Sequence, residues 1–109
     1  MEIEIEKKER FTIVRLIGNL DSNTSPQAQA KILPLASNQC YLALDMSRCN
    51  YVSSAGLRVL LMLAKQFKAQ GGRLGLVGVC EEIKDVMEMT GFINFFEMYN
   101  KLEDLTEDK

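Results

Sequence analysis

The sequence predicts a single α/β domain with a mixed β-sheet. Strand-like segments, either alternating or uniformly apolar, are interleaved with amphipathic segments of helical period. The chain has 109 residues, which suits one domain with one core. Hydrophobic residues make up 47% and charged residues 26%, as in an ordinary globular domain.

The first element predicted is an antiparallel hairpin. Residues 3–7 alternate isoleucine with charged residues, and residues 11–17 are rich in β-forming residues. The charged segment between them favours a turn, and Gly18 closes the second strand. We therefore expect one face of this hairpin to be buried and the other to meet water.

A helix of about ten residues is predicted next, after the turn-forming residues 19–26. Ser25 is expected to cap it, with Pro26 in the first helical position. Ala28, Ile32 and Leu35 share one face of this helix. Pro34 is expected to kink or end it.

Two inner strands are predicted at residues 40–44 and 73–77, where short apolar runs are typical of parallel sheets. The first ends in Asp45, and residues 45–50 are predicted to be the loop beyond its carboxyl end. Residues 11–17, 41–45 and 73–77 should run parallel, joined by right-handed crossovers.

The longest predicted helix begins at residues 53–56 and ends at Gly71 and Gly72. Its apolar stripe has near-helical spacing and consists of Leu57, Leu60, Leu61, Ala64 and Phe67. Met62 lies off this stripe, between Arg58 and Lys65. Its adaptable thioether would suit a protein interface, or it is partly buried under a neighbouring loop.

Three elements are expected towards the C-terminus. Residues 81–89 form a helix with Ile83, Val86 and Met87 inward, and residues 92–96 form a short edge strand or a packed turn. A last short helix is expected from about residue 99. The domain is predicted to span residues 1–102, followed by a short acidic tail at 103–109.

Several functional classes are disfavoured by composition. The chain has no histidine, which excludes a Ser-His-Asp triad, a Cys-His pair and an HExxH zinc site. A formal charge of −2 argues against nucleic-acid binding. Three widely spaced cysteines fit a reducing compartment. The start is unlike a signal peptide and the apolar run at 59–64 is short, so a cytoplasmic protein without membrane insertion is expected.

Two carboxylates leave one catalytic alternative open. Asp21 and Asp45 both follow predicted strands, and together they could bind Mg²⁺ in a small nucleotide-binding protein or hydrolase. Capping or loop bonding is the other interpretation of each. The glycines at residues 72–78 do not form a phosphate-binding fingerprint, because Arg73 stands where its first glycine would be.

Ser53-Ser54-Ala55-Gly56 is the sharpest local feature. Small residues at a helix start leave backbone N–H groups open to an anion. A serine there either caps the helix or carries a phosphate, which adds roughly −1.5 to −2 charges.

These residues belong to a longer pattern. Asp45-Met46-Ser47, followed by Tyr51 to Leu57, resembles the signature of STAS domains, and more narrowly that of bacterial anti-sigma factor antagonists. Gly18 to Asp21 with Thr24 is similar to a family loop. Thr90-Gly91-Phe92, with Phe96 and Tyr99, is similar to its C-terminal segment.

The resemblance implies a small mixed sheet of four or five strands with helices mainly on one side. It also implies a binding protein, not an enzyme, that acts by partner switching. The unphosphorylated antagonist binds an anti-sigma serine kinase and frees the sigma factor. Phosphorylation ends the complex, and a serine phosphatase restores the antagonist. ATP and Mg²⁺ belong to the kinase, so no cofactor is expected in this chain.

Carried over by residue, the resemblance places the phosphoacceptor at Ser54, with Ser53 as the alternative. Many phosphorylated members have aspartate where this chain has Ser53. The residues expected to frame the acceptor or contact the partner are Asp21, Asp45, Ser47, Ser53, Gly56, Leu57, Arg58 and Met62. The alternative function is a STAS scaffold in another signalling or transport complex, without phosphorylation.

Overall fold

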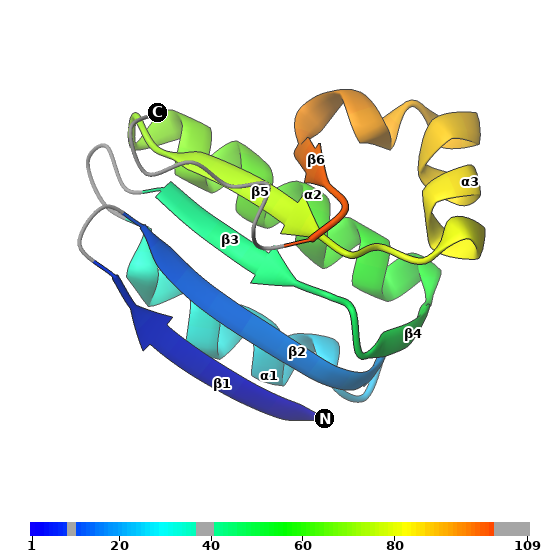
Figure 1. Ribbon diagram of the computed structural model, residues 1–109, viewed down its shortest axis with the longest axis horizontal. Helices are drawn as coiled ribbons and strands as arrows, with labels where there is room; N and C mark the ends of the chain where they lie inside the picture. The colour runs from blue at the N-terminus through cyan, green and yellow to red at the C-terminus, as the bar shows by residue number, and fades with distance from the viewer. Residues whose placement is uncertain (9–10, 37–40, 102–109) are drawn as a thin grey trace.

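A computed structural model describes residues 1–8, 11–36 and 41–101 (Figure 1). These residues form six strands, three α-helices and two 3₁₀ turns. In chain order they are β1 (Glu2–Lys7), β2 (Thr12–Leu20), α1 (Ser25–Ile32), η1 (Leu33–Leu35), β3 (Tyr41–Asp45), β4 (Cys49–Val52), α2 (Ser54–Ala69), β5 (Arg73–Val77), α3 (Glu81–Thr90), η2 (Phe92–Phe95) and β6 (Glu97–Tyr99).

The strands form one mixed sheet in the order β1-β2-β3-β5-β6. β1 and β2 form the predicted antiparallel hairpin, with Ile3 opposite Leu16 and Ile5 opposite Val14. β2, β3, β5 and β6 run parallel, and β4 adds to the far end of β2. The predicted α/β class and the parallel inner strands are therefore confirmed.

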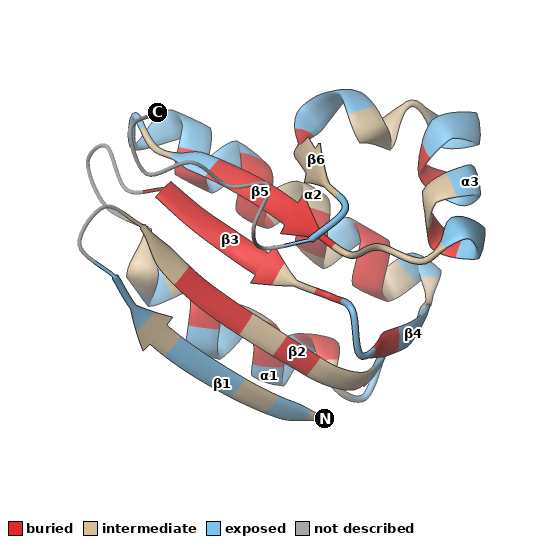
Figure 2. Ribbon diagram, viewed as in Figure 1, coloured by how far each residue is buried: buried red, intermediate tan, exposed pale blue. Residues whose placement is uncertain are grey.

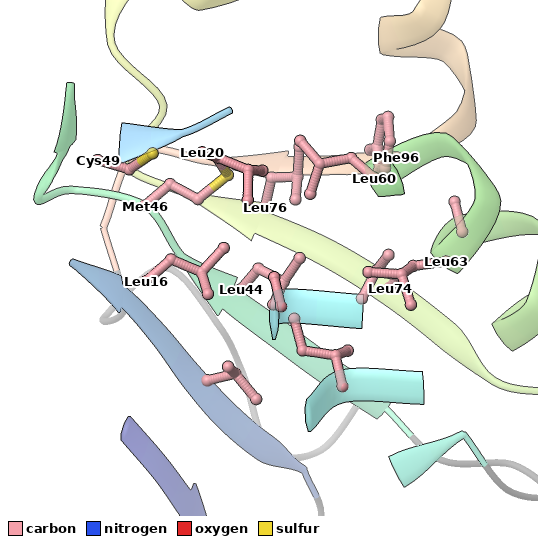
Figure 3. Packing of buried hydrophobic residues seen from close by; sticks show 14 of the residues in the cluster. Leu16, Leu20, Leu44, Met46, Cys49, Leu60, Leu63, Leu74, Leu76 and Phe96 are labelled. Atoms are coloured by element: carbon pink, nitrogen blue, oxygen red, sulfur yellow. The ribbon is translucent and has the colours of Figure 1, made fainter. Parts of the chain in front are cut away.

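The main core lies between the sheet and its helices. Figure 1 shows α1 and α2 behind the sheet, and α3 beside η2 adds Ile83 and Met87 to the same core. Alternate strand residues point into this layer, while β1 stays largely exposed at the sheet edge (Figure 2). The side chains that meet there include Leu16, Leu44, Leu60, Leu63, Leu74 and Leu76 (Figure 3).

A polar cluster joins β3, β5 and β6 through side chains that alternate with the core residues. Arg73 donates two hydrogen bonds to the Glu97 carboxylate, of 2.8 and 2.7 Å. Tyr99 donates to Glu97 over 2.9 Å, and Tyr41 donates to the Tyr99 hydroxyl over 2.9 Å. The Arg73 guanidinium also lies 4.5 Å from the Tyr41 ring centre. Edge strand β6 has only three residues, so these contacts supplement a short backbone ladder.

One predicted loop is wrong, and the second strand does not close at Gly18 as predicted, because β2 continues to Leu20. Residues 49–52, expected partly as loop, form β4, because Gly18 N–H bonds to the Arg48 carbonyl and brings this segment onto β2. Of the two alternatives for residues 92–96, the packed turn is confirmed, because residues 92–95 form η2 and the edge strand is β6. The helix predicted from about residue 99 is wrong at its start, because Tyr99 ends β6 and residues 100–101 are not helical. The rest of that predicted helix lies outside the described residues.

Helix details also differ from the predictions. The N-cap of α1 is Thr24, one residue before Ser25, because the Thr24 hydroxyl closes a turn with Asn19 and Asp21. On α2, Leu63 is buried and Leu61 only half-buried, since the inward stripe follows Leu60, Leu63, Ala64 and Phe67.

The inward face of α3 is narrower than predicted. Ile83 and Met87, four residues apart, are buried, whereas Val86 is 41% exposed on their flank. At the end of α1, Pro34 lies in η1, which confirms that the helix ends beside it. Cys40, residues 9–10 of the predicted turn and residues 103–109 of the predicted acidic tail lie outside the described residues.

Acid should weaken the Arg73–Glu97 hydrogen bonds that hold β6 to β5. The Arg73 guanidinium holds the pKa of Glu97 below its ordinary value near 4.5. A lowered folded-state pKa gives stability that is present above the unfolded pKa and lost as pH falls through the folded one. We therefore expect wild type to be more stable than Glu97→Gln at about pH 6. The difference in their unfolding free energies should become smaller at about pH 3.

Urea unfolding at several pH values measures this difference. Glu88→Gln, at an exposed position of α3, serves as the matched control. A constant gap between wild type and Glu97→Gln across the acid range would contradict the role assigned to the ionised carboxylate.

Candidate functional site

The candidate site lies where the carboxyl ends of the parallel strands meet the start of α2. β2 ends at Leu20, β4 ends at Val52, and α2 begins at Ser54. The Ser53 N–H donates to the Leu20 carbonyl over 2.9 Å, which joins the end of β2 to the helix start. The loop that carries Asp21 follows Leu20 directly, so it lies beside this junction.

Ser53 caps α2. Its backbone is extended, with φ −79° and ψ 174°, and its hydroxyl accepts from the Gly56 N–H over 3.2 Å. Its carbonyl accepts from the Leu57 N–H over 2.8 Å. The Ser53 hydroxyl is thus engaged inside the protein in the usual manner of an N-cap serine.

Ser54 differs from its neighbour in exposure and in the role of its hydroxyl. It is the first residue of α2 and is exposed, whereas Ser53 is half-buried. No hydrogen bond within the described part of the chain engages the Ser54 hydroxyl. The first turn of a helix carries unpaired N–H groups and a partial positive charge, so an anion on Ser54 would be favourably placed.

Gly56 allows α2 to approach the sheet closely. A Cβ atom at Gly56 would lie 2.6 Å from the Leu20 carbonyl oxygen and 3.0 Å from the Val52 side chain. The carbonyl belongs to the last residue of β2 and cannot easily move aside. A glycine at this place therefore sets the position of the whole helix start.

Asp21 orders the loop after β2. Its Oδ1 accepts from the Asn23 N–H over 2.9 Å and from the Thr24 N–H over 3.1 Å. The Thr24 amide is the main cause that lowers the pKa of the Asp21 carboxyl. These contacts are those of a turn-forming aspartate, and they hold the loop against the start of α1.

Asp45 and Ser47 lie in a second group, at the turn between β3 and β4. The Asp45 Oδ1 accepts from the Ser47 N–H over 3.0 Å, and its Oδ2 lies 4.0 Å from the Arg15 guanidinium. Asp45, Ser47, Arg15 and Arg48 line one shallow hollow, together with Glu4. The structure thus gives Asp21 and Asp45 separate partners.

The remaining predicted residues lie along α2. Leu57 is buried in the core, Arg58 is exposed, and Met62 is half-buried against the core. Arg58, Met62 and Lys65 also line a shallow hollow on the outer side of the helix. The structure therefore brings Arg58 and Met62 to one surface that continues from Ser54, while Leu57 supports it from beneath.

Two residues of this region were missed in the sequence. Tyr51 is 53% exposed on β4, two positions before Ser53. No periodic signal marks it in the sequence, because neither residue type nor burial alternates from Cys49 to Val52. Arg15 was assigned only to a strand. Its hydrogen bond of 2.9 Å to Glu6 and its approach to Asp45 depend on strand register, which the sequence alone does not give.

Residues 2–105 match the STAS domain family. The chain belongs to this family. Among sequence relatives of this STAS domain is BtrV of Bordetella bronchiseptica, a candidate anti-sigma factor antagonist. It is 32% identical over 104 residues, which cover 94% of this chain and 90% of BtrV. The anti-sigma F factor antagonist of Paenibacillus polymyxa is 28% identical over 98% of this chain and 94% of its own length.

Solved structures share the fold. A candidate antagonist from Thermotoga maritima superposes with a TM-score of 0.83 at 15% identity, over 94% of this STAS domain and 89% of that chain. The unphosphorylated antagonist SpoIIAA gives 0.68 at 22% identity, over 98% and 92%. These likenesses confirm the predicted STAS fold, and the sequence relatives place the chain in the anti-sigma factor antagonist family.

Among the described residues, no helix is long and apolar enough to cross a membrane.

Replacing Gly56 by alanine should destabilise this STAS domain. In a helix interior, alanine is more stabilising than glycine by about 1 kcal/mol. The added methyl group, however, would lie against a backbone carbonyl, and such overpacking costs roughly 1–3 kcal/mol. We expect Gly56→Ala to lower the unfolding free energy measured in urea.

Ser54→Ala is the control, because it changes an exposed position in the same helical turn and should stay within about 0.5 kcal/mol of wild type. A Gly56→Ala protein as stable as this control would show that the helix start can shift without cost.

Proposed function

We propose that this STAS domain acts as an anti-sigma factor antagonist by partner switching. The unphosphorylated form binds an anti-sigma factor that is a serine kinase, and this binding releases the sigma factor. The kinase uses its own ATP and Mg²⁺ to phosphorylate Ser54, and the complex then dissociates. A serine phosphatase restores the binding form. The chain is a binding protein in this scheme.

The observation that carries this proposal is the division of roles between two adjacent serines. The Ser53 hydroxyl caps α2 and accepts from Gly56, while the Ser54 hydroxyl is exposed. A kinase can therefore reach Ser54 without opening the fold. The cap bonds of Ser53 do not include the Ser54 hydroxyl, so phosphorylation of Ser54 does not require them to break.

The proposed switch acts at the interface and leaves the fold intact. A phosphate on Ser54 would be stabilised in the free protein by the N–H groups of the first turn of α2. In the complex, the same dianion would have to lose water and would repel acidic groups of the partner. A loss of about 3–4 kcal/mol is enough to weaken binding by two to three orders of magnitude.

The exposed neighbours of Ser54 supply a surface for the kinase. Tyr51, Arg58 and half-buried Met62 flank or continue from the acceptor on β4 and α2. Aromatic, arginine and methionine side chains are enriched in the cores of protein interfaces. Because Tyr51 precedes the acceptor by three residues and Arg58 and Met62 follow it at helical spacing, a charge placed on Ser54 would lie inside the contact area.

Substitutions at Ser54 test the switch. Against the cognate anti-sigma kinase, Ser54→Ala should bind as wild type does, and Ser54→Asp should bind at least roughly tenfold more weakly, as one added charge is costly in an interface. Isothermal titration calorimetry measures both. Equal affinities of the two variants would contradict the proposal.

Ser53→Ala is the matched control for this comparison. Loss of the cap should lower the unfolding free energy by about 1 kcal/mol. It should leave kinase binding near the wild-type level under conditions where the protein is folded.

Phosphosite mapping on protein from its native cells tests the acceptor itself. Trypsin releases residues 49–58 as one peptide that carries both serines, and fragmentation distinguishes them. Phosphate on Ser54 in some growth states is the expected result. Phosphate on Ser53, or none in any state, would contradict it, and the second result would favour the STAS scaffold without phosphorylation.

A further inference from the structure

A second concave site lies at the other end of α2, away from Ser54. Its lining comes from the last turns of α2, the start of β5 and the segment that joins η2 to β6. The cleft lies where η2 packs against α2, just before the chain enters β6. The cleft has a volume of about 590 Å³, within the range of small-molecule sites in proteins.

Cations outnumber carboxylates in the described lining of this cleft. Lys65 and Lys68 project from α2 and are exposed, and Arg73 begins β5. The carboxylate among them is Glu97, which Arg73 engages through two hydrogen bonds. With this pair satisfied, two lysine ammonium groups are left in a protein whose net charge is −2.

The cleft also has apolar surface. Ala64, Leu74 and Phe96 are buried side chains that contribute to its lining. Phe95 is 52% exposed at the same cleft, and the Lys65 ammonium lies 5.9 Å from its ring centre. This distance is within the range of a cation–π contact, so Lys65 and Phe95 form one continuous wall from two different elements.

We propose that this cleft binds a small amphipathic organic anion. The apolar body of the ligand would lie against Phe95 and the buried floor. Its carboxylate or phosphate would meet the ammonium groups of Lys65 and Lys68. An inorganic anion would leave the apolar wall in water, and a neutral apolar ligand would leave both ammonium groups without a counter-charge, so the mixed lining favours an anion with an apolar body.

This site lies apart from Ser54, although Lys65 also lines the hollow that holds Arg58 and Met62. Ser54 begins α2, whereas the lysines of the cleft lie eleven and fourteen residues further along the same helix, which rises about 1.5 Å per residue. A ligand at the cleft would touch α2, β5 and the segment before β6, and none of these contacts includes the loops around Ser54.

The first test uses 1-naphthoate as the probe, with ¹⁵N-labelled wild-type protein observed by NMR. A ligand of this size at typical efficiency should bind with a Kd on the order of 1 mM. The backbone signals expected to shift belong to residues of the cleft, such as Lys68, Gly72, Leu74 and Phe95. The neutral analogue 1-naphthalenemethanol should bind several times more weakly.

Variants identify the contacts. Lys65→Gln combined with Lys68→Gln should weaken naphthoate binding roughly threefold to tenfold, and Phe95→Ala should weaken it as well. Lys31→Gln removes an exposed cation from α1 and should leave the Kd unchanged. Ser54→Asp should also leave it unchanged, which separates this test from that of the partner switch.

Three results would overturn the proposal. The first is that no signals of cleft residues shift at naphthoate concentrations up to about ten times the expected Kd. The second is that the neutral analogue binds equally well. The third is that the double lysine variant has the wild-type Kd. The lysine substitutions are at exposed positions, so the variants should keep the wild-type dispersion of NMR signals, which confirms that they are folded.

Discussion

The close approach of α2 to the end of β2 is the constraint on which the site depends. The Leu20 carbonyl accepts a hydrogen bond from Ser53 and lies where a side chain at Gly56 would have to be. Because the residue at position 56 has no Cβ, the helix can start directly on the strand end. That contact fixes the direction of the first helical turn, and with it the positions of both serines.

Both faces of the sheet bury apolar side chains, but the second has a small cluster around Tyr41, Ala43 and Val77 and adds a polar network to it. On the helix side, alternate leucines of β2, β3 and β5 bury their apolar surface against α1, α2 and α3, which gives the domain its main core. Elsewhere on the sheet, the Arg73, Glu97, Tyr99 and Tyr41 side chains connect three strands through hydrogen bonds. Directional contacts of this kind suit β6, whose backbone ladder is too short to define the sheet edge well.

Local sequence patterns were sufficient to predict the hairpin, the inner strands and the start of α2. The alternation in β1 and the uniform apolar run in β3 are local signals, and each corresponds to its place in the sheet. β4 and β6 could not be predicted in the same way. Both are short, and each becomes a strand by pairing with a segment far away in the chain, β2 for one and β5 for the other.

The candidate site shows the same distinction. The cap at Ser53 and the exposure of Ser54 follow from the local order of a cap residue and a helix start. The fact that Asp21 and Asp45 have separate partners does not follow from local order. It depends on which strand residues face Asp45, and Arg15 reaches it only through the register that pairs the two residues across β2 and β3.

The anchoring of Ser53 restricts how any enzyme can act on its neighbour. The chain before Ser54 is bonded to the end of β2 and the chain after it is already helical, so this segment cannot straighten into a groove as an extended peptide would. The substrate of such an enzyme is consequently a folded surface. A short peptide with the same residues would lack the geometry that presents the hydroxyl, and discrimination between substrates would depend on three-dimensional shape.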